Sequence, residues 1–494
     1  MAVSHQFFIQ WSTPSMLFTD ITSKYNNVNN WNHYDSQFNE YKAFRTENHN
    51  YVISDNRDRL SVNAAGITLW MAMLGMAQPQ SVPADTDTPP FNTLYKWKQV
   101  DFEFPTLRLF FLFFSSTYVP ENVLPLGLEV WGSRVWVTFP NWRQGVPATL
   151  ATLPRAGGLA SPPLKPYPDW SYHIAFGSEA NNCSGMTSVF RVNVDPCGRL
   201  WVLDSGQIDL QASPKQICPP SIFVFDLHTD ILVARYNIPK RFILQDSLFS
   251  NIIIDTQNED CSDLHAYIAD TWRFGLLVFR QSDESFWRFS NPVFYPDPLA
   301  ANLTLHGLNF QWPDGIFGLS LSPIDQFSER ILFFSALASY REFFVSTLVL
   351  RDPSRVNNSG TEFHILGESR GSNGQTSASA MDRRGVMFYG LVLRDSIGCW
   401  DSKKYYRKRT QGIVASNGET LVFPNDIKVD QEPQQSVWLI SNRLPMFQAS
   451  SFDPDDYNYR ILYADTEEAV RGTVCDPNVK QPPPSTFIHR GWLP

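Results

Sequence analysis

The amino-acid sequence predicts an all-β fold, a single domain built as a six-bladed β-propeller with four-stranded blades. One strand pattern occurs six times: an alternating apolar segment, a polar turn and a second apolar segment. Aromatic residues make up 14% of the 494 residues, and the 35 prolines outnumber the 26 glycines, which favours strands and loops over long helices. Four-stranded units repeated around an axis form a propeller, which protects its sheet edges by closing into a ring.

The six repeats keep the same order of strands at a nearly constant spacing. Each is predicted to hold about four short strands with turn residues between them. A β-sandwich or two barrels in tandem is the alternative, but neither accounts for six similar spacings. The repeats span residues 126–140, 188–206, 251–270, 316–337, 377–393 and 426–442.

A ring of blades needs a strand from outside the six repeats to close it. The alternating segment YKWKQVDFEF, residues 95–104, lies ahead of the first repeat. We predict that it completes the sheet of the last blade. We also predict a disulfide between Cys399 and Cys475, which would join blades five and six.

The propeller is expected over residues 85–478. The segments before and after it have sequences that are not typical of a propeller. Residues 64–77, AAGITLWMAMLGMA, follow two arginines and end in small residues, which is typical of a secretory signal. This segment is shorter than the roughly 20 residues that span a bilayer, and its alternative is a buried helix. Residues 1–63 are then an atypical extension, either disordered or the result of a start codon placed too early. Residues 479–494 form a proline-rich tail.

A secreted, extracellular protein without membrane insertion is therefore expected, and the remaining cysteines fit this environment. An even number of cysteines behind a signal indicates disulfides, and no Cys-x-x-Cys pair indicates zinc. We expect the pairs Cys197–Cys218 and Cys183–Cys261. Glycosylation is predicted at the sequons of Asn182, Asn302 and Asn357.

The charge pattern limits the partners. The net charge of −9 argues against nucleic acids and anionic membranes, which attract basic surfaces. One basic run occurs at residues 403–409, and we interpret it as a solvated loop. No motif of a cofactor site, a P-loop or a zinc protease is present, so we expect neither a cofactor nor a metal.

Several long segments form a recognisable set of motifs: PLGLEVW (125–131), GVPATLATLP (145–154), SPPLKPYPDWSYH (161–173), CGRLWVLDSGQID (197–209), CPPSIFVFDL (218–227), FQWPDGIFGLSLSP (310–323) and VFPNDIKVD (422–430). They resemble the insect yellow and major royal jelly protein family, and the yellow branch in particular. The resemblance covers residues 94–477 and implies a secreted six-bladed propeller. The apolar segment TLRLFFLFFSST, residues 106–117, departs from the family pattern.

Function in propellers usually lies at the mouth of the central channel, where the innermost strands begin. Each candidate is also of a residue type that commonly caps backbone amides at turns and strand starts. The alternative interpretation is therefore that each has only this structural role. Their convergence on one axis is what favours a site. The candidates are Glu129, Asn251, Asp314, Thr376, Asn425 and Asp426.

Two chemistries compete for this site. By resemblance, a small aromatic amine would contact Asn425, Ile427 and Thr410, with Thr376 beside them and Phe317 and Phe423 as wall residues. Some yellow proteins are instead linked to dopachrome conversion, which needs a base to remove a proton from carbon. Asp314 or Asp426 is the candidate base.

A third chemistry is calcium binding at the channel floor. Glu129, Asn251, Asn425 and Asp314 carry the hard oxygen ligands that calcium prefers. We favour the small molecule and expect a role in cuticle pigmentation or melanin metabolism, by binding or converting a catecholamine- or indole-derived compound. The alternatives are a non-catalytic binder of biogenic amines and a structural or developmental protein without a small ligand. The oligomeric state is not predicted.

Overall fold

The structure, a computed structural model, divides into two units that we describe separately, Met1–Pro83 and Ala84–Pro494. The signal-like segment 64–77, the apolar segment 106–117 and the sequon at Asn182 lie outside the described residues. So does nearly all of the proline-rich tail. The described residues are 42–45, 51–55, 58–62, 88–104, 118–157, 160–173, 183–256, 261–262, 264–325 and 329–479.

The first unit contains three short strands that the sequence pattern did not predict. They form an antiparallel sheet in the order β1-β2-β3. Their bounds are Lys42–Arg45 for β1, Tyr51–Asp55 for β2 and Asp58–Val62 for β3.

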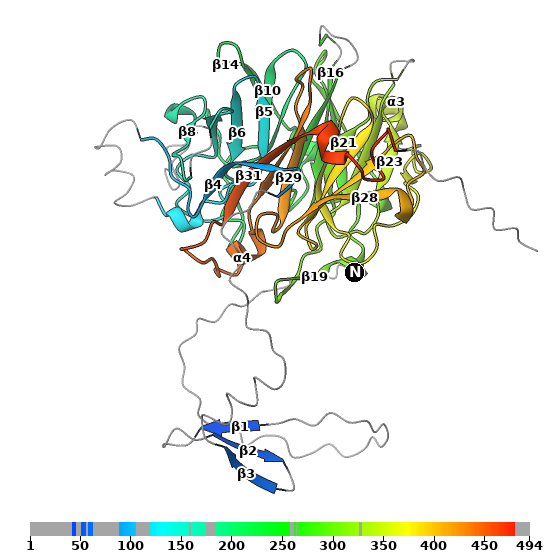
Figure 1. The fold of residues 1–494 in the computed structure, drawn as a ribbon. Coiled ribbons are helices and arrows are strands. Elements are labelled where there is room, and N and C mark those ends of the chain that lie inside the picture. The colour runs from blue at the N-terminus through cyan, green and yellow to red at the C-terminus, as the bar shows by residue number, and fades with distance from the viewer. Residues whose placement is uncertain are drawn as a thin grey trace, which may run out of the picture. The chain divides into compact units, whose positions relative to one another are not determined.

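The second unit is the predicted six-bladed propeller (Figure 1). Blade one holds β5 (Leu128–Trp131), β6 (Arg134–Thr138), β7 (Leu150–Pro154) and β8 (Lys165–Pro166). Blade two holds β9 (Val189–Val194), β10 (Arg199–Asp204), β13 (Ser221–Asp226) and β14 (Ile231–Asn237). Blade three holds β15 (Phe249–Thr256), β16 (Leu264–Asp270), β17 (Gly275–Arg280) and β18 (Ser285–Ser290).

The remaining three blades follow the same order. Blade four holds β21 (Ile316–Leu321), β22 (Ile331–Ala336), β23 (Phe343–Ser346) and β24 (His364–Ile365). Blade five holds β25 (Thr376–Met381), β26 (Val386–Leu391), β27 (Ser396–Asp401) and β28 (Gln411–Ser416). Blade six holds β29 (Pro424–Val429), β30 (Ser436–Ser441), β31 (Tyr459–Asp465) and β4 (Asn92–Trp97).

Strand β4 closes the ring, as the sequence predicted. It pairs antiparallel with β31, where Tyr459 faces Trp97 and Ile461 faces Tyr95, and Figure 1 shows the two strands side by side. The predicted segment, residues 95–104, overlaps β4 only in its first three residues. The strand itself begins earlier, at Asn92. The N-terminal end of the propeller is thereby built into its last blade.

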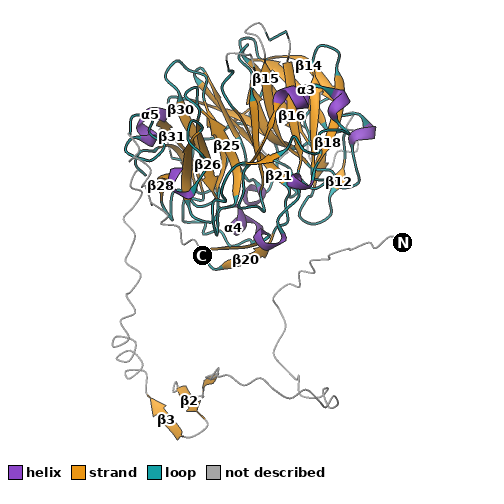
Figure 2. Cartoon of the chain, turned by 90° about the vertical axis from the view of Figure 1, so that its right-hand side faces the viewer, coloured by secondary structure: helices purple, strands orange, loops and turns teal. Residues whose placement is uncertain are grey.

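Short helices and hairpins lie in the loops within and between the blades (Figure 2). No helix among the described residues is both long and apolar enough to cross a membrane. The α-helices are α3 (Thr347–Arg351), α4 (Leu444–Gln448) and α5 (Thr466–Val470), and the hairpins are β11–β12 (Gln207–Ile208, Lys215–Gln216) and β19–β20 (Asn302–Leu305, Leu308–Gln311). The 3₁₀ helices are η1 (Pro120–Asn122), η2 (Trp170–Tyr172), η3 (Lys240–Phe242), η4 (Pro292–Phe294), η5 (Pro298–Ala300), η6 (Pro353–Arg355) and η7 (Lys408–Thr410).

An aspartate after the inner strand fixes the first turn of several blades. In blade two, Asp195 Oδ1 accepts hydrogen bonds from the backbone nitrogens of Cys197 and Arg199, and its Oδ2 accepts from the indole of Trp201. In blade six, Asp430 Oδ2 accepts from the indole of Trp438 in the same way. Both indoles are fully buried. In blade two, one carboxylate therefore holds the backbone of the turn and also fixes an indole that packs between the blades.

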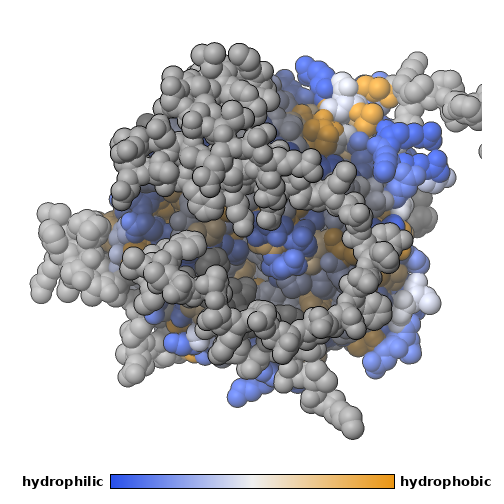
Figure 3. All heavy atoms as spheres, turned by 90° about the horizontal axis from the view of Figure 1, so that it is seen from below, coloured by the Kyte–Doolittle hydropathy of each residue, from blue (hydrophilic) through white to orange (hydrophobic). Residues whose placement is uncertain are grey.

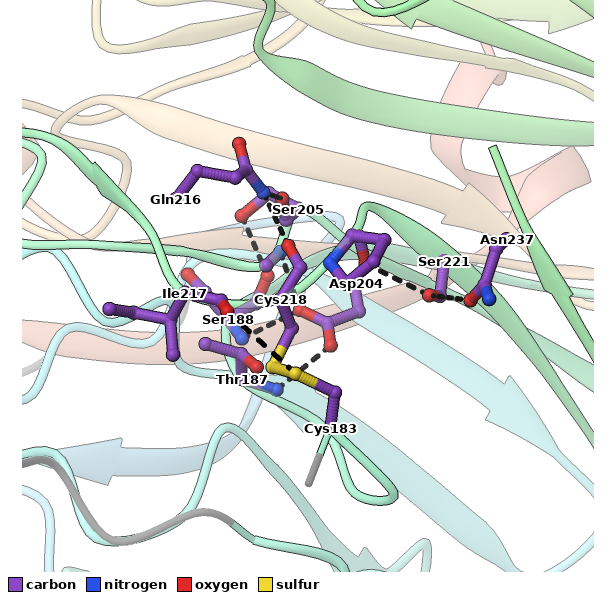
Figure 4. Close-up of a disulfide and its surroundings, with 12 residues drawn as sticks. Cys183, Thr187, Ser188, Asp204, Ser205, Gln216, Ile217, Cys218, Ser221 and Asn237 are labelled. Atoms are coloured by element: carbon purple, nitrogen blue, oxygen red, sulfur yellow. Dashed lines mark hydrogen bonds between the residues drawn. A yellow bond between two sulfur atoms is a disulfide. The ribbon is translucent and has the colours of Figure 1, made fainter. Parts of the chain in front are cut away.

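The disulfide Cys399–Cys475 forms as predicted, but the other two predicted pairs are wrong. The structure pairs Cys183 with Cys218 and Cys197 with Cys261. Cys197 lies in the first turn of blade two and Cys261 in the first turn of blade three, so the bridge joins equivalent turns of neighbouring blades. Figure 4 shows the Cys183–Cys218 bridge, which ties the segment before β9 to the segment before β13.

Two of the predicted sequons lie within the described residues. Asn302, at the start of β19, is exposed. Asn357, which follows η6, is exposed as well. Both asparagines are therefore accessible to modification, while glycosylation itself stays a prediction.

Candidate functional site

Two hollows lie at opposite ends of the channel formed by the six inner strands. These strands, β5, β9, β15, β21, β25 and β29, contact one another in turn around the ring. One hollow, which we call the strand-start pocket, contains residues at or before the beginnings of the inner strands and has about 580 Å³ of space, open solvent at its mouth included. The other, the strand-end pocket, contains later residues of the same strands and has about 1640 Å³ on the same measure.

The strand-start pocket is the more apolar of the two. Its face also carries α4 and the β19–β20 hairpin, and the part that is visible from below in Figure 3 presents both polar and apolar side chains. The pocket is lined by Leu126, Trp142, Phe190, Leu210, Gln211, Leu248, Trp272, Trp312, Asp314, Phe317, Leu337, Ser377, Phe423, Asn425, Leu444 and Gln448.

Aromatic rings form much of its wall. The Trp312 and Phe423 rings stack at a centroid distance of 6.1 Å and an angle of 11°. The Trp142 and Phe190 rings pack at 5.9 Å on another part of the wall. Such surfaces bind flat, conjugated ligands by burying both ring faces.

Asp314 is the only charged residue among the described residues that line this pocket. It precedes β21, is 7% exposed, and accepts a 3.1 Å hydrogen bond from the indole nitrogen of Trp272 on its Oδ1. Burial raises the pKa of Asp314 from 3.8 to about 7, although the indoles of Trp272 and Trp312 oppose the shift by stabilising the carboxylate. A carboxyl group with a pKa near neutrality is able to take and return a proton.

Asn425 offers a polar group to the same pocket. Its Oδ1 accepts a 3.2 Å hydrogen bond from Arg191, while its buried Nδ2 has no hydrogen-bond partner among the described residues. The backbone oxygen of Asn425 accepts hydrogen bonds from Arg191 at 2.7 Å and from the hydroxyl of Ser377 at 2.8 Å. Since a buried donor without an acceptor is unfavourable, this amide is suited to a ligand oxygen.

A buried ion pair lies beside the strand-start pocket and holds Asp426. Arg191, which is fully buried, pairs with Asp426. Asp426 also accepts hydrogen bonds from the backbone nitrogens of Leu128 at 3.0 Å and Ile427 at 2.9 Å. The Arg191 guanidinium lies 5.6 Å from the centre of the Phe317 ring. Asp426 is therefore tied to three inner strands and contacts the strand-end pocket, not the pocket that contains Asp314.

The structure brings only some of the predicted ligand contacts together. Asn425 and Phe317 line the strand-start pocket with Asp314, whereas Ile427 lines the strand-end pocket. Thr376 is buried at the start of β25, where its hydroxyl donates to the Ala378 carbonyl at 3.0 Å, and it lines neither pocket.

Thr410 lies apart from both channel pockets, so its predicted place beside Asn425 is wrong. Its hydroxyl accepts a 3.0 Å hydrogen bond from the backbone nitrogen of Arg407 in the cap of η7, before the outer strand β28. A threonine in this position stabilises the turn that leads into the outer strand.

The four proposed calcium ligands are also divided. Asp314 and Asn425 line one pocket, and Glu129 and Asn251 line the other. Glu129 accepts hydrogen bonds from Asn193 at 3.1 Å and from the backbone of Val194 at 3.2 Å. Asn251 donates to the Phe317 carbonyl at 2.7 Å. The side chains of Glu129 and Asn251 form hydrogen bonds within the channel wall, and the four candidate ligands do not converge on one point.

One group of potential metal ligands occurs in the described part of the chain: Asp195, Cys197 and Cys261. The two cysteines are joined as a disulfide, and Asp195 holds its own turn. This group is therefore structural.

Comparison with known proteins identifies the family. The sequence model described as "Major royal jelly protein" matches residues 187–475. The chain belongs to the yellow and major royal jelly protein family. It is 44% identical over 393 residues to a dopaminechrome tautomerase of Drosophila melanogaster, a match that covers 78% of this chain and 84% of the relative.

A second relative agrees with this assignment. Protein yellow of Drosophila melanogaster is 41% identical over 397 residues, which cover 79% of this chain and 72% of the relative. The solved structure of virginiamycin B lyase from Staphylococcus aureus is 12% identical, with a TM-score of 0.37 over 70% of this chain and 95% of that chain. That likeness is too distant to bear on the function of this yellow-family chain.

Sequence reasoning missed the indoles that surround Asp314. Trp312 stands two residues before it in the segment FQWPDG, yet only the aspartate was chosen as a site residue. Trp272 lies in the turn between β16 and β17 of the preceding blade. The turn after the second strand of one blade lies on the same side as the start of the next inner strand, and this rule would have pointed to Trp272.

Proposed function

We propose that this yellow-family protein converts a catecholamine-derived aminochrome to a dihydroxyindole by tautomerisation, as part of melanin or pigment metabolism. The observation that carries the proposal is Asp314, a buried carboxyl with a pKa of about 7 within an aromatic pocket. The 44% identical dopaminechrome tautomerase supports the same reaction class.

The proposed reaction is an isomerisation that needs no oxidant or cofactor. The Asp314 carboxylate removes a proton from a saturated carbon of the five-membered ring. The electron pair of that C–H bond moves into the six-membered ring, and one quinone oxygen takes up a proton. Loss of a second proton, from the neighbouring saturated carbon, then forms the carbon–carbon double bond of the indole while the other quinone oxygen is protonated, so that two protons leave carbon and two are taken up by oxygen. In this proposal the buried Nδ2 of Asn425, which has no partner among the described residues, donates a hydrogen bond to the developing oxyanion.

The pocket also favours a particular substrate charge. A substrate that carries a carboxylate would be repelled by Asp314 whenever Asp314 is ionised, and no cationic residue among the described lining residues would balance it. We therefore propose that a decarboxylated aminochrome is preferred over its carboxylated counterpart. Equal kcat/KM for dopaminechrome and dopachrome would contradict this preference.

The proposed location is extracellular. Three disulfides connect the described part of the propeller, and disulfides persist in oxidising compartments. Two exposed sequons are consistent with passage through the secretory pathway. Peptide mapping of protein secreted from insect cells would show whether Asn302 and Asn357 carry glycans.

The direct test is the loss of dopaminechrome absorbance with purified protein. The variant Asp314→Asn is expected to lower kcat by about 10²–10⁴, the usual effect of losing general base catalysis. Asp455→Asn, a change at an exposed carboxylate outside the pocket, is the matched control and should keep full activity.

Two other outcomes would replace this proposal. Saturable binding of dopamine or serotonin in calorimetry, without turnover of dopaminechrome, would make the protein a binder of biogenic amines. Neither turnover nor binding would point to the structural or developmental role.

A further inference from the structure

A second hollow lined by aromatic residues lies between blades four and five, away from the channel. We call it the blade 4–5 groove. It has about 1080 Å³ of space, open solvent above it included. Most of its lining comes from strands β22, β23 and β27 and from the loops that follow β24 and β27. The lining residues are Ser322, Ile331, Phe333, Phe344, Leu366, Gly367, Glu368, Trp400, Ser402, Lys404, Tyr405, Tyr406 and Arg407.

Aromatic rings form the floor of this groove, where Trp400, Phe333 and Tyr406 are buried, and the exposed ring of Tyr405 lies at its edge. The Trp400 ring meets Phe333 edge-on at 5.8 Å and Tyr406 edge-on at 5.1 Å. The indole nitrogen of Trp400 already donates to the Lys404 carbonyl at 3.0 Å. Tyr405 is 81% exposed, with the Arg407 guanidinium 5.1 Å from its ring centre. The groove thus offers the exposed face of Tyr405 beside a floor of packed rings, which suits an apolar and stiff segment.

The C-terminal part of the propeller ends beside this groove. The Cys399–Cys475 disulfide fixes the chain to β27, on the face of blade five opposite to Trp400. Lys404, a groove residue, donates hydrogen bonds from Nζ to the carbonyls of Val474 at 2.7 Å and Asp476 at 3.4 Å. The last described residue, Val479, follows three residues later.

The residues that follow have the composition of a groove-binding segment. Residues 480–494 read KQPPPSTFIHRGWLP, with three consecutive prolines and four large apolar side chains. Proline-rich segments adopt the polyproline II conformation and dock into aromatic-lined grooves. Five residues lie between Asp476 and Pro482. The six steps along the chain reach about 19 Å at roughly 3.1 Å per residue.

We propose that residues 480–494 of this chain dock into the blade 4–5 groove, with Pro482–Pro484 against the exposed ring of Tyr405. The attachment at Cys475 makes this an intramolecular contact, so a weak intrinsic affinity is sufficient because the effective concentration is in the mM range. The tail would then cover the aromatic surface between blades four and five.

Limited trypsin digestion of the folded, full-length protein tests the proposal. Docking slows cleavage after Arg490, because the protease acts on the released segment. The variant Tyr405→Ala is expected to speed this cleavage by about tenfold or more, as is the triple change Pro482→Ala, Pro483→Ala and Pro484→Ala. Tyr405 is exposed, so its loss leaves the fold intact, and Tyr295→Ala, at a 55% exposed tyrosine outside the groove, is the matched control.

Hydrogen exchange of residues 402–407 provides the second measurement. Exchange in this loop should be faster in the triple proline variant than in the wild type, and unchanged in Tyr295→Ala. Equal cleavage and equal exchange in all variants would overturn the proposal. Protection that increases with protein concentration would overturn it too, because the tail would then bind a second copy of the chain.

Discussion

The indole nitrogen of Trp272 lies 3.1 Å from Oδ1 of Asp314 and joins blade three to the first residues of blade four. An indole N–H only donates, so it holds the carboxyl in place in either protonation state. Burial raises the pKa of Asp314 to about 7 in spite of this donor. The contact therefore positions the proposed base and limits how far its pKa rises.

The activity is expected to depend on pH through Asp314. A general base acts in its ionised form, so kcat/KM should rise as the pH increases through about 7 and then level off. Initial rates of dopaminechrome conversion, corrected for the spontaneous reaction at each pH, measure this. A profile that is flat between pH 5 and 9 would exclude Asp314 as the base, provided that the protein stays folded over that range.

Removing the indole donor should shift this profile. The variant Trp272→Phe keeps an aromatic wall but loses the hydrogen bond that lowers the pKa of Asp314. The midpoint of the kcat/KM profile should therefore move above about 7, and activity at neutral pH should fall. A purely structural role of Trp272 would lower activity without moving the midpoint. Trp170→Phe, a tryptophan outside the pocket, is the control.

The same carboxyl should make the stability of the protein depend on pH. The pKa of Asp314 is raised in the folded state, so the folded protein holds this proton from pH about 4 to about 7 while the unfolded chain has lost it. The free energy of unfolding therefore falls as the pH rises through this window, by about 4 kcal/mol at most for a shift of about 3 units.

The variant Asp314→Asn removes this titration. Its stability relative to the wild type should increase from pH 4 to pH 8, when measured by urea unfolding at each pH. The control Asp455→Asn should follow the wild type. A constant difference between Asp314→Asn and the wild type across this range would show that Asp314 has an ordinary pKa.

Local patterns in the sequence were sufficient to predict the propeller. The alternation of apolar residues and the turn chemistry locate the inner strands, because both are set by neighbours along the chain. The inner strands of blades four and five begin at Ile316 and Thr376, against predicted starts of 316 and 377. The closing strand was found by the same alternation.

Long-range contacts could not be predicted in this way. The partner of Asp426 is Arg191, more than 200 residues earlier, and no local pattern links them. The Cys197–Cys261 bridge depends on two turns of neighbouring blades lying side by side. Thr410 illustrates a different kind of error. The family resemblance predicts that it contacts the ligand, whereas the structure shows that it caps a turn at the outer edge of blade five.

The buried pair of Arg191 and Asp426 allows the last prediction. Each change alone, Arg191→Met or Asp426→Asn, leaves one buried charge without its partner, and breaking such a pair lowers stability by about 3–5 kcal/mol. The double variant should lose less than the sum, since no uncompensated charge remains, and a double-mutant cycle of urea unfolding gives the coupling. The exposed pair of Glu468 and Arg471 is the matched control and should show no measurable coupling.

The cycle also separates a structural Asp426 from a catalytic one. If Asp426 only supports the channel, the activity of Asp426→Asn should recover together with stability in the double variant. A fully stable Asp426→Asn protein without activity would instead make Asp426 the base. Because Asp426 is held by Arg191 and two backbone nitrogens and faces the pocket opposite Asp314, we expect the first result.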